Sequence, residues 1–195
     1  VSTVTLVEAV CAPLSNADMK LAVDACLGET TASASGNCPI FAAASNGAGC
    51  NNGGVNGLIG EWDVSQVEDM SDAFRGETFF NGDITTWDVS GVENMSGMFQ
   101  NAQAFNQDIG AWDVSSVENM TLMFNNASTF NQDISAWDVS AVENMSNMFN
   151  EALAFNQSLN SWDVSGVENM SGMFSGATSF NGALSTWDLD SSEDT

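Results

Sequence analysis

The sequence predicts an α/β solenoid, an elongated body in which short coils of chain stack on one another. A nine-residue phrase, Trp87-Asp88-Val89-Ser90-Gly91-Val92-Glu93-Asn94-Met95, returns every 25 residues with at most its fifth residue changed, and later copies open at Trp112, Trp137 and Trp162. All six tryptophans of the chain lie in this series, because variants of the phrase open at Trp62 and Trp187. A period in the twenties with repeated apolar residues is typical of solenoids, whose coils are stable only when stacked.

Residues 1–54 precede the first full coil and are expected to form an N-terminal cap. We predict a helix near Asp18–Leu27, with Ser15 or Asn16 as its N-cap and Gly28 as its stop. Its predicted apolar stripe consists of Leu21, Ala22, Ala25 and Cys26. Residues 29–54 are small, polar and rich in glycine, which predicts a loop. Such a cap would shield the apolar edge of the first coil.

All four cysteines, Cys11, Cys26, Cys38 and Cys50, fall within the first 50 residues. An even number of cysteines in one small segment favours two disulfides and hence an oxidising compartment. A zinc site is the alternative, and it is disfavoured because no two cysteines have Cys-x-x-Cys spacing. Three disulfide pairings are possible, and the sequence does not choose among them.

Residues 55–190 are expected to form five to six coils. The apolar residues after Met95 follow it at spacings of 3, 4, 7 and 10, which predicts a helical face made of Met98, Phe99, Ala102 and Phe105. Ser96 is its predicted N-cap. Trp112 and Val114 flank Asp113, which predicts a short strand with the aspartate pointing outward. Each coil should therefore contain one short parallel strand and one short helix or 3₁₀ turn, with methionines and aromatic side chains in the core.

The repeat resembles the BspA-like branch of the leucine-rich-repeat proteins. The motifs that carry the resemblance are Phe105-Asn106-Gln107-Asp108-Ile109-Gly110-Ala111-Trp112-Asp113-Val114-Ser115 and Asn119-Met120-Thr121-Leu122-Met123-Phe124. Residues 21–26, which lead to Trp62, are also similar to a cap found before such repeats in surface proteins of unicellular eukaryotes. The resemblance implies a right-handed stack of coils in a secreted or cell-surface protein of adhesive or structural function, without shared catalytic residues. One departure is the glutamate after the second valine, where the family often has threonine.

The charge of the chain is extreme, with 26 acidic residues against Lys20 and Arg75 and a net charge of −24. Nucleic acids and anionic membranes need a positive surface, so both are excluded as partners. The chain has no histidine, which removes the commonest general base and neutral metal ligand. No apolar run is long enough to span a membrane. Because the sequence begins at Val1, we expect a processed, secreted product or an excised fragment.

One carboxylate per coil should point outward at strand spacing, roughly 4.8 Å from the next. This row consists of Asp63, Asp88, Asp113, Asp138, Asp163 and Asp188. Two arrangements could offset the repulsion between neighbouring carboxylates of this row. Each aspartate can accept hydrogen bonds from the N–H or hydroxyl of the serine two residues on. Alternatively, Ca²⁺ bridges carboxylates of adjacent coils, although the sequence contains no EF-hand or glycine-rich calcium loop.

Asparagines form further rows. Asn81, Asn106, Asn131, Asn156 and Asn181 follow a phenylalanine at one bend, and each is expected to bond the backbone of the next coil in a buried amide ladder. Six asparagines also lie in Asn-x-Ser/Thr sequons and are candidate glycosylation sites: Asn94, Asn119, Asn126, Asn144, Asn156 and Asn169. Asn126 is the preferred site, and Asn156 is the weakest because its ladder role competes.

These observations predict a non-enzymatic extracellular or cell-surface protein of structural or adhesive function, binding protein or glycan. A calcium-binding or mineral-associated acidic surface protein is the alternative. No cofactor is expected besides the Ca²⁺ of that alternative. Residues 191–195 form an acidic tail with no helix to cover the last coil. Either the native chain continues, therefore, or another subunit packs there, for example head to tail in a fibre.

Overall fold

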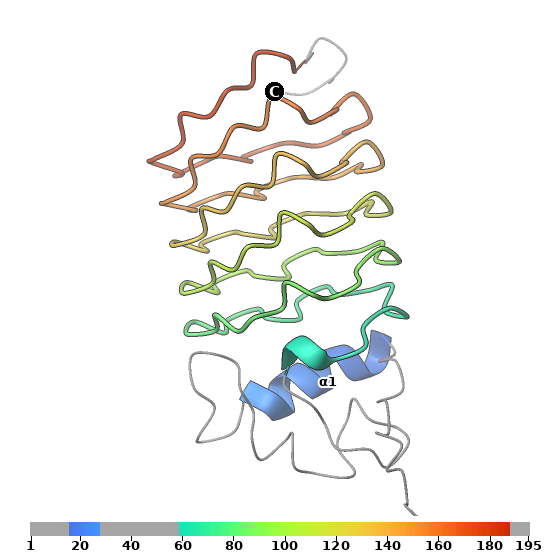
Figure 1. Ribbon diagram of the computed structural model, residues 1–195. Coiled ribbons are helices and arrows are strands. Elements are labelled where there is room, and N and C mark those ends of the chain that lie inside the picture. The colour runs from blue at the N-terminus through green and yellow to red at the C-terminus, as the bar shows by residue number, and fades with distance from the viewer. Residues whose placement is uncertain (1–15, 28–58, 188–195) are drawn as a thin grey trace, which may run out of the picture.

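The computed structural model describes residues 16–27 and 59–187 of the chain. The described part holds one α-helix, α1 (Asn16–Leu27), one short 3₁₀ helix, η1 (Ile59–Glu61), and then a stack of coils. The coils lie one above another, and the chain climbs from α1 at one end to residue 187 at the other (Figure 1). No helix among the described residues is long and apolar enough to cross a membrane. The predicted stack of 25-residue repeats is confirmed.

Helix α1 is found where it was predicted, but it is rotated about its axis. Its buried side chains follow the i, i+3, i+4, i+7 pattern of one helical face and are those of Met19, Ala22, Val23 and Cys26. Leu21, predicted to lie on the buried stripe, is 60% exposed. The buried side chains of α1 belong to the same hydrophobic cluster as Ile59 and Trp62. The helix therefore covers the N-terminal end of the stack.

Several predictions fall outside the described ranges. These concern the loop of residues 29–54, the tail of residues 191–195, Ser15, Gly28 and Asp188. Cys26 in α1 is fully buried and disulfide-bonded, whereas Cys11, Cys38 and Cys50 lie outside the described ranges. The pairing of the cysteines therefore stays a prediction.

The predicted strand at the Trp-Asp-Val phrase is wrong, although the predicted directions of its side chains are right. Trp112 and Val114 are buried and Asp113 is exposed. The backbone around them, however, makes local turns, because the N–H of Trp112 donates to the Ile109 carbonyl at 3.1 Å and that of Val117 to the Val114 carbonyl at 2.9 Å. Backbone pairing between coils occurs farther along, as single parallel β-bridges that link Asp69, Asn94, Asn119, Asn144 and Asn169 in succession.

The predicted helix after Met95 is also wrong, and a run of β-turns stands in its place. The N–H of Met98 donates to the Met95 carbonyl at 3.2 Å across a turn whose third residue, Gly97, has φ +64°. The next such turn has Asn101 at φ +62°. A positive φ at the third position defines a type II turn and interrupts a helix. Ser96 therefore has no helix to cap, and its own N–H donates to Asn94 Oδ1 at 3.0 Å.

Backbone hydrogen bonds between coils arise because alternate N–H groups of this turn segment point along the stack. Gly97 donates to the Thr121 carbonyl at 2.8 Å and Phe99 to the Met123 carbonyl at 2.9 Å. The N–H groups in between are satisfied within their own coil by the turns. Every coil is thus fastened to the next by a ladder, although no continuous strand is present in the described coils.

The core consists of columns of identical side chains that run the length of the stack. Phe99 stacks on Phe124 with ring centroids 5.6 Å apart, and Phe105 stacks on Phe130 at 6.0 Å. The indole N–H of Trp112 donates to the Ile84 carbonyl of the preceding coil at 3.2 Å. Burial of each such side chain contributes about 1.5–3 kcal/mol, so the columns hold the coils together. The predicted assignment of methionines and aromatic residues to the core is confirmed.

Candidate functional site: acidic rows along the stack

The aspartates that follow the tryptophans form one outward row, which we call the aspartate row: Asp63, Asp88, Asp113, Asp138 and Asp163. Each is held by the serine two residues later. The Ser90 hydroxyl donates to Asp88 Oδ1 at 2.6 Å and the Ser90 N–H to the same oxygen at 3.2 Å. The Ser115 hydroxyl and N–H bond Asp113 Oδ1 in the same way, at 2.7 and 3.1 Å. Local hydrogen bonding, the first of the two arrangements predicted to offset repulsion between the carboxylates, is therefore present.

These hydrogen bonds lower the pKa of four members of the aspartate row. The serine hydroxyl, and then the serine N–H, lower the pKa of Asp88, Asp113, Asp138 and Asp163 below the ordinary value. The charges of the neighbours act in the opposite direction on the pKa of Asp138, but their effect is weaker than that of the hydrogen bonds. Two unit charges about 5 Å apart in water repel by only about 0.8 kcal/mol, and these carboxylates lie on the exposed surface.

A second row of acids, missed by the sequence reasoning, lies at the start of the Asp-Ile segment and consists of Asp83, Asp108 and Asp133. Each accepts the N–H of the residue two positions later, at 3.0–3.2 Å. Hydrogen bonds from Thr85 and Ser135 lower the pKa of Asp83 and Asp133. Asp108 and Asp133 also line a shallow depression between coils with Gly110 and Ser135. The signal was present in the repeated Asp-Ile dipeptide, whose aspartate is exposed whenever its isoleucine is buried.

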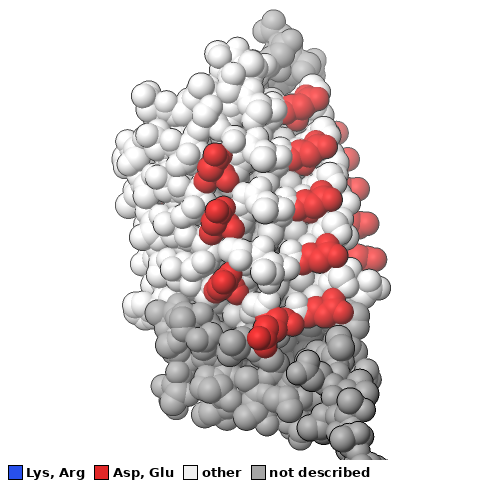
Figure 2. Space-filling model, in the orientation of Figure 1, with Lys and Arg blue, Asp and Glu red and all other residues white. Residues whose placement is uncertain are grey.

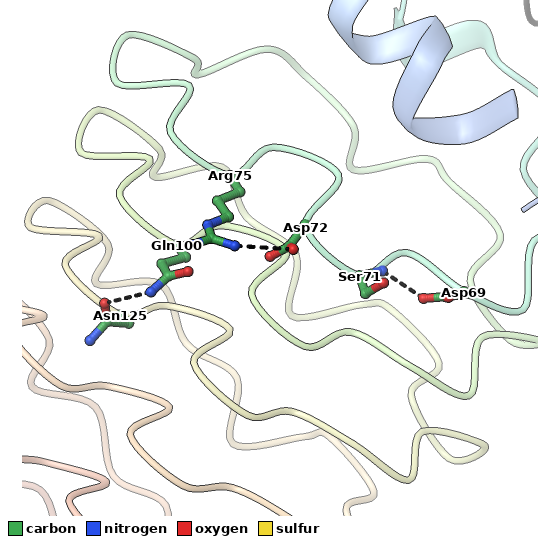
Figure 3. A network of polar contacts seen from close by, with 6 residues as sticks. All are labelled: Asp69, Ser71, Asp72, Arg75, Gln100 and Asn125. Atoms are coloured by element: carbon green, nitrogen blue, oxygen red, sulfur yellow. Dashed lines mark hydrogen bonds and ion pairs between the residues drawn. The ribbon is translucent and has the colours of Figure 1, made fainter. Parts of the chain in front are cut away.

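The glutamates that follow the second valine form a third exposed row: Glu68, Glu93, Glu118, Glu143 and Glu168. Figure 2 shows acidic side chains in parallel columns along one face of the stack, with no lysine or arginine among them. The two cations of the sequence are engaged elsewhere. Lys20 pairs with Asp24, and Arg75 pairs with Asp72 at 3.3 Å (Figure 3). The face is therefore uniformly negative.

The carboxylates are spread along rows and do not converge on one point. Within residues 16–27 and 59–187, no group of three or more cysteine, aspartate or glutamate side chains is placed to hold a metal ion. The predicted Ca²⁺ ladder would therefore have to form between rows of singly placed carboxylates, and it stays a prediction. The aspartate row and the row of glutamates recur from coil to coil.

The asparagine ladder at the bend forms as predicted. The N–H of Asn106 donates to Asn81 Oδ1 at 2.8 Å, and the same bond links Asn131 to Asn106 and Asn156 to Asn131, each at 2.9 Å. The ladder is less buried than predicted, because Asn81, Asn106 and Asn131 are half-buried and Asn156 is exposed. At this bend, the ladder joins the asparagine side chain of each coil to the backbone of the next coil.

The sequon asparagines differ in how their side chains are engaged. Asn94, Asn119 and Asn144 are half-buried, and each accepts the N–H of the residue two positions on. Asn126, the preferred site, has φ +55°, and its Nδ2 donates to Asn101 Oδ1 at 2.9 Å. Because Nδ2 is the atom that would carry a glycan, this contact competes with modification. Glycosylation of each sequon stays a prediction.

A fourth polar surface overlies the type II turns and was not predicted. Gln100 Nε2 donates to Asn125 Oδ1 at 3.2 Å (Figure 3), and Asn125 Nδ2 donates to Asn150 Oδ1 at 2.8 Å. At the start of this surface, the Ser71 N–H donates to Asp69 Oδ1 at 2.9 Å (Figure 3). The Gln100–Asn125 and Asn125–Asn150 contacts fasten neighbouring coils through neutral amides, whereas the Ser71–Asp69 bond lies within one coil.

The stacked coils, the aromatic columns and the repeated polar rows define the chain as a solenoid repeat protein. A family model described as "Mycoplasma protein of unknown function, DUF285" matches residues 46–141 and residues 107–195, which together span most of the chain. The chain belongs to this family. No curated protein and no solved structure matches it.

Proposed function

We propose that this protein is a non-enzymatic extracellular or cell-surface scaffold, of the BspA-like leucine-rich-repeat type, whose acidic rows bind cationic partners. The observation that carries the proposal is the aspartate row, in which hydrogen bonds from serine hold the carboxylates in one orientation and lower the pKa of Asp88 and Asp113. Regularly spaced fixed charges suit a protein or glycan surface that carries amines at intervals.

Two further observations support this proposal over catalysis and over an intracellular role. Catalysis needs one preorganised constellation, whereas the aspartates after the tryptophans and the glutamates after the second valine recur from coil to coil, and the sequence has no histidine to act as a base. The disulfide at Cys26 favours an oxidising compartment.

Binding to an immobilised lysine-rich peptide tests the proposal. The variant Asp88→Asn/Asp113→Asn/Asp138→Asn removes three charges from the aspartate row and keeps an oxygen to accept from each serine. Glu93→Gln/Glu118→Gln/Glu143→Gln removes the same charge from the glutamate row. We expect the first variant to bind at least ten times more weakly than the wild type, about 1.4 kcal/mol, and the second to lose less. Equal losses of binding in the two variants would mean that only net charge matters, and would contradict a specific role of the aspartate row.

Ca²⁺ binding is the second candidate, supported by carboxylates of low pKa in successive coils. A ligand that binds the folded state raises its stability, so a specific site predicts that Tm rises with Ca²⁺ concentration in high NaCl. Mg²⁺ at equal concentration is the control for screening. An unchanged Tm, or an equal rise with both ions, would reject a specific calcium site.

A further inference from the structure

Leu122 occupies a backbone position that is unusual for a leucine. The N–H of Met123 donates to the Met120 carbonyl across a type II turn whose third residue, Leu122, has φ +59°. Such a position favours glycine or asparagine. The equivalent residues of the other coils are Asp72, Gly97, Asn147 and Gly172. A leucine in the left-handed region is strained, and strain of this kind persists where the surrounding structure or a function maintains it.

The hydrophobic core does not account for this leucine. Within residues 16–27 and 59–187, Leu122 belongs neither to the buried cluster nor to the partly buried side chains packed against it. It lies half-buried at the outer surface of the stack, where every equivalent residue is glycine or polar. Burial within the chain therefore offsets little of the strain, whereas a ligand that covered this side chain would offset more.

Two ladders of amide side chains lie beside the column of Leu122. Asp72, in that column, pairs with Arg75 in the next one (Figure 3), and a Cβ added at Gly97 would lie 3.8 Å from Gln100 Oε1. The column and the ladders thus share one face of the stack. This face, which we call the amide surface, consists of Gln100, Asn101, Leu122, Asn125, Asn126, Asn147 and Asn150, all half-buried.

The ladders end on polar atoms that the protein leaves unpaired. Gln100 and Asn126 donate through their side-chain nitrogens, and Asn101 and Asn150 accept through their side-chain oxygens. Among the described residues, no donor reaches Gln100 Oε1 or Asn126 Oδ1. In the same part of the chain, the Nδ2 groups of Asn101 and Asn150 reach no acceptor. A hydroxyl group donates to oxygens and accepts from amide nitrogens, so a ligand rich in hydroxyl groups suits all four atoms.

The amide surface is nearly uncharged. The three turn segments that form it, residues 94–101, 119–126 and 144–151, contain a single charged residue, Glu151. On a chain of net charge −24, a cationic partner is drawn to the acidic rows and an anionic partner is repelled. This surface therefore suits an uncharged ligand.

The repeat of the amide surface suits a polymer. Parallel β-bridges link the coils, so equivalent atoms recur roughly every 4.8 Å along the stack. Each sugar of an extended β-linked glucan advances that polymer by a similar length. Every such sugar also has hydroxyl groups at its edge and C–H groups on its faces, and the C–H groups are the part that contacts an apolar side chain.

We infer that the amide surface binds an extended, uncharged β-linked glucan of the cellulose type. Leu122 packs against the C–H face of one sugar ring, and the four unpaired amide atoms bond hydroxyl groups along the polymer. Weak contacts repeated along one chain add up to a useful affinity. The residues that carry this inference belong to coils with a described neighbour on both sides, and the inference is independent of the role proposed for the acidic rows.

Cellohexaose, a soluble β-linked glucose hexamer, tests the inference by titration into the ¹⁵N-labelled full chain. We expect saturable changes in the side-chain amide signals of the amide surface, with a Kd of about 1 mM or lower. Raising NaCl should leave this Kd unchanged because the ligand is uncharged, whereas binding of a lysine-rich peptide to the acidic rows should weaken. The failure of one proposal is thus distinguishable from the failure of the other. Maltohexaose, the α-linked isomer of different shape, is the control and should bind at least five times more weakly.

Two variants remove parts of the amide surface while keeping its turns. Leu122→Gly removes the apolar side chain and relieves the backbone, so the variant should stay folded and yet bind cellohexaose at least five times more weakly. Asn101→Gly/Asn126→Gly removes two of the unpaired amide atoms. Glycine already stands at the equivalent positions, Gly76 and Gly176, so the turns are kept and binding should fall about tenfold.

Two further variants are matched controls on other surfaces. Leu21→Ala truncates an exposed leucine of α1, and Asp88→Asn/Asp113→Asn/Asp138→Asn changes the aspartate row alone. Both should bind cellohexaose as the wild type does. The inference would be overturned by a lack of saturation up to about 10 mM cellohexaose, by wild-type affinity in Leu122→Gly, or by equal affinity for maltohexaose.

Discussion

The coil from Met145 to Trp162 and the coil from Met170 to Trp187 have the same methionines, phenylalanines and tryptophan at their core positions, but very different surroundings. In the first, which we call the interior coil, Met145 and Phe149 are 0% exposed and Trp162 is 3% exposed. In the second, the last described coil, the equivalent side chains are only partly buried. The difference teaches that stability in this molecule is set by the neighbours of a coil more than by its own residues, as expected for a quasi-one-dimensional protein. Opening should therefore start in the last described coil.

Truncation of a stacked phenylalanine should have the largest effect. Phe124→Ala leaves a cavity between Phe99 and Phe149 and is expected to lower the free energy of unfolding by about 3–5 kcal/mol. Phe174→Ala, at the equivalent position of the last described coil, should cost clearly less because its side chain is only partly buried. Urea denaturation of both variants measures the difference, and equal losses would contradict the comparison.

Glycine substitutions at close backbone approaches come next. A Cβ added at Gly110 would lie well inside contact distance of the Asp133 carbonyl oxygen, and one at Gly182 would meet the Gln157 carbonyl in the same way. We expect Gly110→Ala to lower stability by about 1–3 kcal/mol, and Gly182→Ala to lower it less because the last described coil can shift. Gly91→Ala, whose Cβ would be 3.7 Å from the nearest atom, is the control and should change thermal stability little.

Leucine at a left-handed position offers a stabilising change. Leu122 has φ +59°, where the equivalent residue in the preceding coil is Gly97. Leu122→Gly removes strain of about 1–2 kcal/mol and adds an entropic cost of about 0.5–1, so a gain of several tenths of a kcal/mol is expected. Leu153, partly exposed and without a positive φ, is the control, because Leu153→Gly should only destabilise. Differential scanning calorimetry distinguishes the two, and a loss at both positions would exclude strain at Leu122.

The smallest effect is expected at the surface. The pKa of Asp113 is lowered by Ser115, so this carboxylate stabilises the fold above its unfolded pKa, about 3.9, and the contribution is lost as pH falls through the lower folded pKa. Ser115→Ala should raise the pKa of Asp113, and its loss in Tm relative to wild type should be greater at pH 7 than at pH 2. Ser165→Ala tests Asp163, the last aspartate of the row, in the same way. Carboxyl ¹³C NMR measures both pKa values, and an unchanged value would contradict the assigned cause.

The sequence predicted which side chains point inward, but not the backbone that carries them. Periodicity reports direction, and the spacing from Met95 to Phe105 is the same for a helix as for a run of turns. A helix and a run of turns differ in their φ angles, and the sequence contained one indication of φ that the prediction did not use. Glycine or asparagine stands at one repeat position in four coils, as Gly76, Asn101, Asn126 and Gly176. Glycine and asparagine are the residues that favour a positive φ.

The candidate site was predicted in part. The aspartate row and its serine partners follow from the Trp-Asp-Val-Ser phrase, because an outward carboxylate beside a serine favours a short local bond. Leu21 was placed on the wrong face of α1, since the helix is short and its apolar residues leave two faces possible. The amide surface of Gln100 and Asn125 escaped prediction because its residues vary from coil to coil and meet only across coils.

The bond from each tryptophan to the coil before it has a consequence for how the molecule is built. The indole N–H of Trp137 donates to the Ile109 carbonyl and that of Trp162 to the Ile134 carbonyl. Each coil therefore supplies the donor, and the preceding coil supplies the acceptor. A chain leaving the ribosome or a translocon can thus set each turn of the stack on a finished template, with contacts no farther along the sequence than the adjacent repeat. Short-range contacts favour rapid folding. Pulled from its C-terminus, the protein should release its length in regular steps of one repeat, and a single all-or-none rupture would refute this stepwise order.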